Sequence, residues 1–240
     1  MNAELIEHPR ERSGSGEARP LTRTAPAGPR VARPSPRLAG AYDMFDPRCE
    51  EIRALRTELL LRREPGDLAD VIALLSPRTG DGRSQLAAEL AIAFAQLDRP
   101  TLLVDADLRH PTQHLLFAAD NKFGLSQAIK HGDTPYLHRV EGLPQLSLLT
   151  AGPTPDNALE LLLNKRFGTL LDEWRENFDF VVVDTAPITE YSDGLAVANL
   201  VKRALVLTRA RHTPYRESRD LLRRLVAIRS QVVGAVINHF

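Results

Sequence analysis

Residues 71–97 read VIALLSPRTGDGRSQLAAELAIAFAQL, and this stretch decides the fold. Its first five residues are all apolar, which predicts a buried strand at 71–75, and a helical pattern of apolar residues begins at about residue 83. The turn between them contains Gly80 and Gly82, which can adopt positive φ angles. A glycine-bearing turn between a buried strand and a helix N-terminus offers free N–H groups and the helix dipole to a phosphate. The stretch therefore predicts a phosphate-binding loop in an α/β domain.

This loop follows the Walker A pattern G-x-x-x-x-G-K-[ST] with two departures. Pro77 stands where the first glycine is expected, and Arg83 replaces the lysine. A guanidinium keeps the positive charge but is bulkier than an ammonium, so we expect nucleotide binding to survive and turnover to fall. The residues expected to bind the nucleotide phosphates are Gly80, Asp81, Gly82, Arg83, Ser84 and Gln85, with the Ser84 hydroxyl placed for Mg²⁺. For the loop taken alone, the alternative is a glycine-rich surface turn.

Acidic residues follow two further apolar segments. TLLVDADLR (101–109) places Asp105 and Asp107 two residues apart at the end of an expected strand, so both side chains point to the same side. FVVVDTAP (180–187) ends its strand in Asp184, in the form of a Walker B carboxylate. Open α/β sheets bind ligands at the carboxyl ends of their strands. One such Asp is commonly a cap or turn residue, but three in this order after a glycine loop indicate a shared site.

Elsewhere, short apolar runs alternate with helical patterns. Strands are expected at 71–75, 101–105, 146–150, 180–184, 204–208 and 232–238, and helices at about 83–97, 158–177 and 216–230. The strands are almost wholly apolar, which is typical of a parallel sheet covered by helices on both faces. The sequence therefore predicts an α/β fold with a mostly parallel β-sheet, and loops between residues 110 and 146 that surround the site.

The N-terminal part differs in composition from the rest. Residues 1–41 are rich in Pro, Gly, Ser and Arg, which predicts a disordered tail, and residues 42–240 then form the nucleotide-binding domain. Within that domain a helix is expected at 46–64, with Ile52 and Leu59 on its apolar face.

The bulk composition excludes several classes of protein. The 240 residues carry a formal net charge of +0, so nothing overall draws the chain to nucleic acid or an anionic membrane. Cys49 is the single cysteine, which excludes an internal disulfide and a cysteine-based metal cluster. No run approaches the roughly 20 apolar residues that span a bilayer, and residues 1–12 lack the apolar core of a signal peptide. We expect a cytoplasmic protein that neither binds nucleic acid nor spans a membrane.

From about Asp46 to Phe240 the chain resembles the bacterial tyrosine kinases of the CapB/CpsD type, relatives of the MinD/ParA ATPases that accompany capsule and exopolysaccharide export. The most specific stretch is TLLVDADLRHPTQHLLF (101–117). Four other segments match the family in order, namely SPRTGDGRS (76–84), AGPTPDNALELL (151–162), FVVVDTAP (180–187) and GAVINHF (234–240). The resemblance implies a P-loop NTPase fold with a deviant Walker motif.

The resemblance also implies roles for single residues. ATP and Mg²⁺ are the expected cofactors, with Mg²⁺ bound by Ser84, Asp105 and Asp184. Asp107 is the expected base for a tyrosine hydroxyl, so the expected catalytic residues are Asp107, Asp105 and Arg83, the last in place of the family lysine. Asn238 resembles the asparagine that contacts the adenine edge, the alternative being an Asn that caps a turn at a strand end.

Expected partners follow from the same resemblance. Glu50-x-x-Arg53-x-x-Arg56 is similar to the family's E-x-x-R-x-x-R motif, which implies a homo-oligomer, although a solvated helix face is the alternative. Such kinases work with a membrane chain-length-determinant adaptor, here expected as a separate polypeptide that holds the chain at the inner membrane. Arg78 lies where the MinD/ParA branch has a lysine that acts across a dimer.

Three functions stay open on the sequence. The first is an ATP-dependent tyrosine kinase that regulates exopolysaccharide polymerisation and export; among the four dispersed tyrosines, Tyr42 is the expected local acceptor. The second is a catalytically weak nucleotide-binding regulatory subunit of the export machinery, which Arg83 favours. The third is a MinD/ParA-like ATPase that works on membranes or DNA.

Overall fold

The computed structural model of the chain describes residues 31–43, 45–62 and 70–239. Its strands are β1 (Val31–Ala32), β2 (Asp70–Leu75), β3 (Thr101–Asp105), β4 (His138–Val140), β5 (Leu143–Leu149), β6 (Phe180–Asp184), β7 (Arg203–Arg209) and β8 (Gln231–Asn238). Its helices are α1 (Pro47–Leu61), α2 (Arg83–Ala95), α3 (Gln113–Leu116), α4 (Leu125–His131), α5 (Ala158–Leu162), α6 (Lys165–Asn177), α7 (Asp193–Val201) and α8 (Tyr215–Ala227), with a 3₁₀ turn, η1, at Ala39–Ala41.

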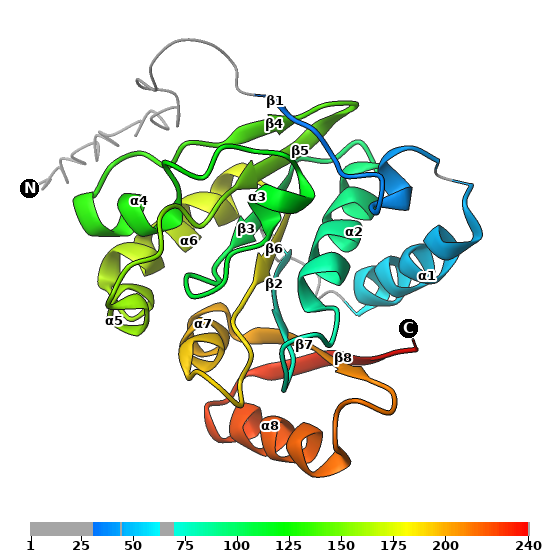
Figure 1. Cartoon of the computed structure of the whole chain (residues 1–240), viewed down its shortest axis with the longest axis vertical. Helices are drawn as coiled ribbons and strands as arrows, with labels where there is room; N and C mark the ends of the chain where they lie inside the picture. The colour runs from blue at the N-terminus through cyan, green and yellow to red at the C-terminus, as the bar shows by residue number, and fades with distance from the viewer. Residues whose placement is uncertain (1–30, 44, 63–69, 240) are drawn as a thin grey trace, which may run out of the picture.

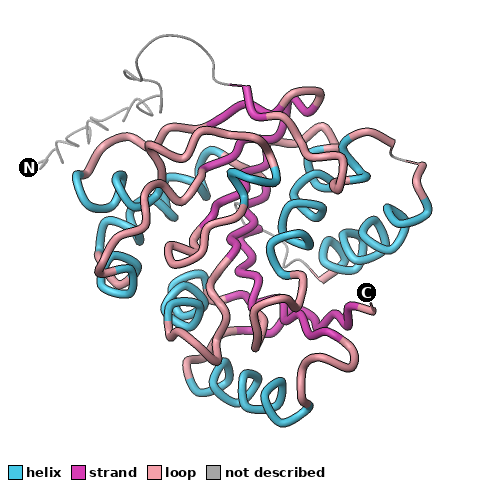
Figure 2. The backbone as a smooth tube through the Cα atoms, viewed as in Figure 1, coloured by secondary structure: helices cyan, strands magenta, loops and turns pink. Residues whose placement is uncertain are grey.

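All the described strands belong to one sheet, in the order β1-β4-β5-β3-β6-β2-β7-β8. Neighbours run parallel except β4 and β5, which are antiparallel. The sheet passes through the middle of the molecule, with α1 and α2 on one side and α4 to α7 on the other (Figures 1 and 2). The predicted α/β fold, a mostly parallel sheet with helices on both faces, is confirmed. Its order places β3, β6 and β2 side by side.

Alternation along β2 shows how the sheet divides the core. Val71, Ala73 and Leu75 join the apolar cluster on the side of α4 to α8, whereas Ile72 and Leu74 join the cluster on the side of α1 and α2. Successive side chains of a strand point to opposite faces, so an all-apolar strand needs cover on both. Burial of each Val, Leu or Ile contributes about 1.5–3 kcal/mol, and these two clusters therefore hold the central strands rigidly.

One predicted helix needs correction, and another helix was missed. The helix expected at 158–177 is two helices, α5 and α6, because Asn164 starts a new one: its Oδ1 accepts the N–H of Arg166 at 2.9 Å, an N-cap contact. Helix α7 was not predicted at all. It is short and lies between two strands, and its buried side chains include Val197 and Val201.

The predicted tail is too long at its C-terminal end. Residues 1–30 lie outside the described part of the chain, but residues 31–41 pack on the domain. β1 pairs with β4, Leu38 is buried against the α2 side of the core, and Glu89 of α2 accepts the N–H groups of Ala39 and Gly40. Ala32, Leu38 and Ala39 of this segment are buried on the domain, although Val31 is exposed, and composition alone does not reveal this packing.

Helix α1 begins and packs as its sequence indicates. Asp46 caps it by accepting the N–H of Arg48 at 2.9 Å, and Pro47 occupies the first turn. Leu59 is buried against α2, and Ile52 is half-buried on the same side. The predicted amphipathic helix is confirmed as far as Leu61, while positions 63–64 lie outside the described residues. In the part of the chain that the structure describes, no helix is long and apolar enough to cross a bilayer.

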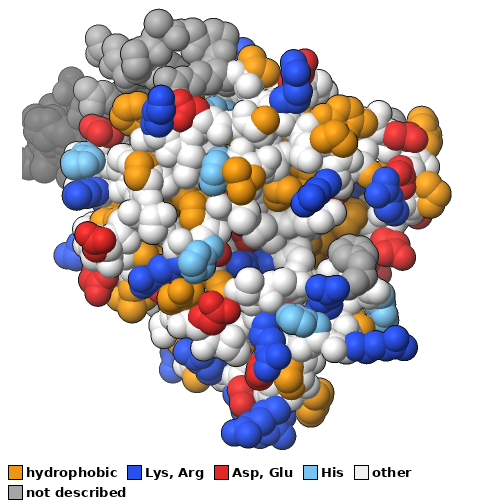
Figure 3. All heavy atoms as spheres, in the orientation of Figure 1, with side chains coloured by type: hydrophobic (Ala, Val, Ile, Leu, Met, Phe, Trp, Pro, Cys, Tyr) orange, Lys and Arg blue, Asp and Glu red, His pale blue; other side chains and the backbone are white. Residues whose placement is uncertain are grey.

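The zero net charge conceals a local concentration of positive charge. On the face shown in Figure 3, Lys and Arg side chains gather at the lower end, over α8. There Arg216, Arg219 and Arg223 surround Asp220 at N···O distances of 3.8–3.9 Å. Exposed pairs at this separation contribute little, about 0–1 kcal/mol each. On this face, an anionic partner would meet the largest gathering of positive side chains at α8.

Candidate nucleotide site

Three neighbouring strands bring the acidic residues to the glycine loop. β6 lies between β3 and β2, and Asp105 stands directly opposite Asp184 in the β3–β6 register. Asp107 follows β3 by two residues, and the loop follows β2 after Leu75. All three Asp side chains are buried. The structure thus brings together the carboxylates that the sequence assigned to one site.

The loop has the backbone that its glycines predict. Gly80 and Gly82 have φ angles of +84° and +98°, in the left-handed region. A Cβ atom at Gly82 would lie 2.5 Å from Nδ2 of Asn238, so another residue would displace the Asn238 side chain as well as strain the backbone. Helix α2 starts at Arg83, and the first N–H groups of a helix have no acceptor within it. These groups, with the helix dipole, suit a bound phosphate.

Asp81 and Asn238 hold the loop in this shape. The Asp81 carboxylate is buried, where it accepts the backbone N–H of Arg78 at 2.9 Å and the hydroxyl of Thr213 at 2.5 Å. Asn238 Nδ2 donates to the backbone carbonyl of Asp81 at 2.9 Å. Asp81 therefore shapes the loop through its side chain. Asn238 lies against the loop at the end of β8, and its contact with an adenine stays a prediction.

Arg83 points to the carboxylates. Its Nε donates to Asp184 Oδ1 and its Nη2 to Asp107 Oδ2, both at 3.2 Å, and its Nη1 donates to Ser76 Oγ at 2.8 Å. The side chain is only 7% exposed. A planar fork can span two carboxylates in this way, whereas a lysine ammonium is a point charge. The replacement of lysine by arginine thus creates an internal clamp between β3 and β6.

Asp105 and Asp107 are held by backbone N–H groups of the segment that follows β3. Asp105 Oδ2 accepts from Thr112 and Gln113 at 3.1 and 3.0 Å, and Asp107 Oδ1 accepts from His110 at 2.9 Å. Burial, together with the nearby charge of Asp184, raises the pKa of Asp105 well above its usual value. Burial also raises the pKa of Asp107, and the hydrogen bond from His110 and the charge of Arg83 oppose that rise.

Replacing Asp105 by Asn should flatten the pH dependence of stability. A raised pKa means that the folded state binds the proton more tightly than the unfolded chain does. From the unfolded value of about 3.9 up to the raised pKa, stability therefore falls as pH rises. Urea unfolding at pH 5.5 and 7.5 measures this slope. Asp133→Asn, at an exposed position, serves as the control; a slope in Asp105→Asn as steep as that of the unmodified protein would contradict the prediction.

Gln113 is a buried site residue that the sequence analysis did not single out. Its Nε2 donates to Asp184 Oδ2 at 2.8 Å and to the backbone carbonyl of Ser84 at 2.9 Å. It lies in the predicted 101–117 stretch, but a glutamine at the start of a short helix is ordinarily a surface residue. Only the fold shows that this side chain, with no exposed surface, crosses to the loop.

The donor set suits a hydrated magnesium ion. Three buried carboxyl groups share the cluster with one guanidinium, which pairs with Asp107 and Asp184, so acidic groups outnumber basic ones there. Among the described residues, no three His, Cys, Asp or Glu side chains are placed to hold a metal by themselves. Magnesium usually keeps several waters and takes one or two carboxylates besides phosphate oxygens. Ser84, Asp105 and Asp184 fit that pattern, and their binding of Mg²⁺ stays a prediction.

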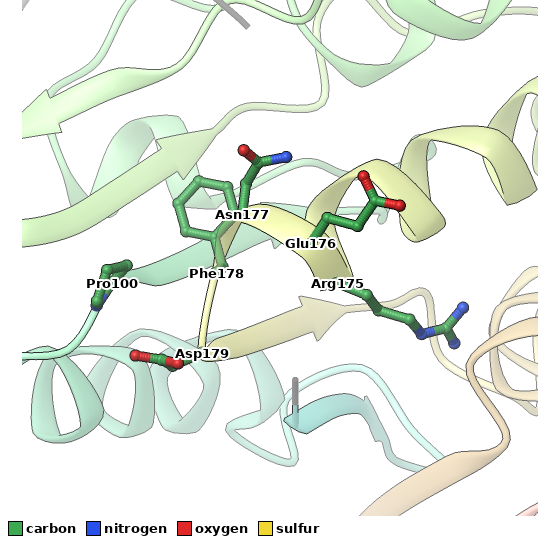
Figure 4. Close-up of a pocket in the computed structure, with 6 residues that line it drawn as sticks. All are labelled: Pro100, Arg175, Glu176, Asn177, Phe178 and Asp179. Atoms are coloured by element: carbon green, nitrogen blue, oxygen red, sulfur yellow. The ribbon is translucent and has the colours of Figure 1, made fainter. Parts of the chain in front are cut away.

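A separate surface hollow lies at the other end of the sheet. It has a volume of about 280 Å³ and is lined by Pro100 and by residues 175–179, at the N-terminal ends of β3 and β6. Figure 4 shows Phe178 and Pro100 on one side and the charged groups of Arg175 and Glu176 on the other. Open α/β sheets bind ligands at the carboxyl ends of their strands, so this hollow is not taken as the nucleotide site.

Sequence comparisons place the chain among known proteins. CapB of Staphylococcus aureus is 33% identical over 193 residues, which cover 79% of this chain and 83% of CapB. The tyrosine-protein kinase YwqD of Bacillus subtilis is 30% identical, over 79% of this chain and 80% of YwqD. The chain belongs to the bacterial tyrosine-kinase family. In contrast, it matches only 27% of the length of the tyrosine-protein kinase etk of Escherichia coli, at 32% identity. No protein-family model matches the chain.

Solved structures agree with the membership of the kinase family. The chimerical protein CapA2B2 has a TM-score of 0.79 at 28% identity, over 88% of this chain and 94% of that one. The kinase domain of Escherichia coli ETK has a TM-score of 0.80 at 27% identity, over 90% and 84% of the two chains. The cell division ATPase MinD of Pyrococcus furiosus, at 17% identity, shares the fold with a TM-score of 0.61 over 70% and 71%. The predicted kinase-type P-loop fold is confirmed.

The three charged residues of the kinase family's E-x-x-R-x-x-R motif stand three residues apart along α1 and make different contacts. Arg53 pairs with Glu50, with Nη2 to Oε2 at 2.6 Å; the Glu50 side chain is exposed, whereas the Arg53 side chain is only 24% exposed. Arg56 instead donates from Nη1 to the carbonyl of Ala93 in α2, at 2.8 Å, and burial lowers its pKa. Arg56 thus joins α1 to its own domain, and a contact of Glu50 and Arg53 with a neighbouring copy stays a prediction.

Two further residues considered on the sequence make contacts within the chain. Arg78 forms a two-pronged ion pair with Glu217 of α8, at 2.6 and 2.5 Å. This pair would have to open before Arg78 could reach a second subunit. The ring of Tyr42 is largely exposed, but its hydroxyl donates to the carbonyl of Pro34.

Proposed function

We propose that this chain is an ATP-dependent protein-tyrosine kinase that regulates the polymerisation and export of an exopolysaccharide or capsule. The observation that carries the proposal is the buried cluster of Asp105, Asp107 and Asp184, joined through Arg83 to a glycine loop at the start of α2. Phosphoryl transfer needs mainly positioning and neutralisation of charge, and these residue types supply both. Relatives named as tyrosine-protein kinases support tyrosine as the acceptor.

Asp107 is the proposed base. As the tyrosine oxygen bonds to the γ-phosphorus and the bond to ADP breaks, Asp107 takes the hydroxyl proton. Backbone N–H groups of Arg109 and His110 hold its Oδ1. Burial raises its pKa, which strengthens it as a base nearer to neutral pH. Mg²⁺, when bound, neutralises phosphate charge, and we propose that Ser84, Asp105 and Asp184 hold it.

Partners are proposed on the same basis. The exposed carboxylate of Glu50, with the Arg53 guanidinium that it pairs with, would contact a neighbouring copy in a homo-oligomer. A chain-length-determinant adaptor in the inner membrane would bind the kinase and keep it at the cytoplasmic surface. The likeness to the chimerical protein CapA2B2 and the family membership support this arrangement.

One observation favours a second candidate function, a nucleotide-sensing regulatory subunit with little catalysis. The same Arg83 guanidinium contacts both Asp107, the proposed base, and Asp184. Such a clamp neutralises the base and competes with phosphate for the guanidinium. ATP could then bind and change the assembly of the export machinery without efficient transfer.

The test uses the purified chain with γ-labelled Mg-ATP, alone and with the cytoplasmic segment of its adaptor. A kinase will place label on tyrosine, in itself or in the adaptor segment. Tight ATP binding without label or hydrolysis would assign the regulatory function instead. Absence of nucleotide binding under both conditions would overturn both candidates.

A further inference from the structure

Gln113 connects two parts of the site that no other described side chain connects in this way. Its amide nitrogen donates both to Asp184 Oδ2 at the end of β6 and to the carbonyl of Ser84 in the first turn of α2. Because Arg83 already donates to Asp184 Oδ1, the Asp184 carboxylate has a donor on each oxygen. Donors on both oxygens fix the plane of a carboxylate as well as its position.

The other end of the same amide has no partner. Gln113 Oε1 is buried and makes no hydrogen bond within the described residues, and the same is true of Thr112 Oγ1 and His114 Nδ1 beside it. An unsatisfied buried polar atom costs about 1–3 kcal/mol, and Gln113 Oε1 belongs to the amide that contacts Asp184 and Ser84, so it indicates a polar group that arrives with a ligand. Gln113 Oε1 is an acceptor, so it suits a water of a hydrated cation.

We infer that Gln113 is a positioning residue for the hydrated magnesium ion of the nucleotide. Its N–H groups orient Asp184 and tie that carboxylate to Ser84, and its carbonyl oxygen accepts a hydrogen bond from a metal-bound water. The inference rests on the proposed nucleotide site and adds a residue to it. Outer contacts of this kind typically change metal affinity about 10–100-fold when they are removed.

Gln113→Met tests this role because methionine has a similar length but cannot make the hydrogen bonds to Asp184 and to the carbonyl of Ser84. Calorimetric titration of ADP at a series of Mg²⁺ concentrations, and in EDTA, separates an effect on metal binding from an effect on nucleotide binding. We expect the Mg²⁺ concentration for half-maximal tightening to rise about 10-fold, with ADP binding in EDTA unchanged. Gln113→Asn keeps an amide in the buried site but cannot reach Asp184. If the methionine variant does not fold, Gln113→Asn replaces it, and its magnesium midpoint is measured in the same titration.

The matched control is Gln145→Met. Gln145 Nε2 also donates to an aspartate, Asp98, at 2.7 Å, but at the start of β5 and away from the loop. Its magnesium midpoint should equal that of the unmodified protein. The inference would be overturned if the Gln113 variants had the same magnesium midpoint as the unmodified protein. It would also be overturned if they lost as much ADP affinity in EDTA as in Mg²⁺. An unmodified protein that binds no nucleotide would instead overturn the proposed function.

Discussion

Replacing Asp107 by Asn is expected to lower phosphoryl transfer to tyrosine at least about 100-fold, the lower end of what a positioned general base contributes. The amide oxygen of Asn can still accept the N–H groups of Arg109 and His110, so the turn after β3 should keep its shape. What is lost is the proton acceptor and one of the two charges that face Arg83. The initial rate of phosphotyrosine formation from γ-labelled ATP measures the effect.

Two comparisons make that experiment specific. Asp133→Asn removes an exposed carboxylate after α4, far along the chain from the cluster, and should retain the full rate. ADP binding to Asp107→Asn should persist, because the loop and α2 are untouched. A variant that keeps more than about a tenth of the rate would show that the base is another group, given the contribution expected of a base.

The fold could be predicted to this extent because its signals are local. The conformation of β2, of the glycine loop and of the start of α2 could each be predicted from the residues of that segment alone. Apolar strands that alternate with helices then imply a parallel sheet. Asp105, Asp107 and Asp184 were predictable as a group for a related reason. Asp105 and Asp184 end strands and Asp107 follows two residues after Asp105, and parallel strands end at one edge of the sheet.

The parts that were not predicted depend on contacts between distant segments. Residues 31–41 have the composition of a tail, yet β1 adds to β4 and Leu38 fills the core beside α2. The sequence alone suggests that Gln113 is a surface residue. Its burial follows only from the position of α3 against α2 and β6. Arg83 was expected to bind phosphate, and its pairing with Asp107 and Asp184 follows from the geometry of its fork, which no spacing in the sequence encodes.

Replacing Arg83 by Met should lower the free energy of unfolding by about 3–5 kcal/mol, as found when one partner of a buried ion pair is removed. Without the guanidinium, Asp105, Asp107 and Asp184 remain buried together with no cation. Burial raises the pKa of Asp105 and of Asp107, and protonation of these two groups relieves the repulsion, so the loss should be smaller at pH 5.5 than at pH 7.5. Arg83→Lys keeps the charge and should retain most of the stability. It also restores the lysine of the Walker A pattern and should raise phosphoryl transfer.

Urea unfolding of the nucleotide-free protein in EDTA provides these values. Arg223→Met is the matched control, since Arg223 lies on the exposed side of α8, 3.8 Å from Asp220, and should change stability by less than about 1 kcal/mol. If Arg83→Met is as stable as this control, the clamp does not hold β3 and β6 together. If Arg83→Lys transfers phosphate no faster than the unmodified protein, the guanidinium does not limit turnover. In that case Arg83 would no longer be an argument for the regulatory function.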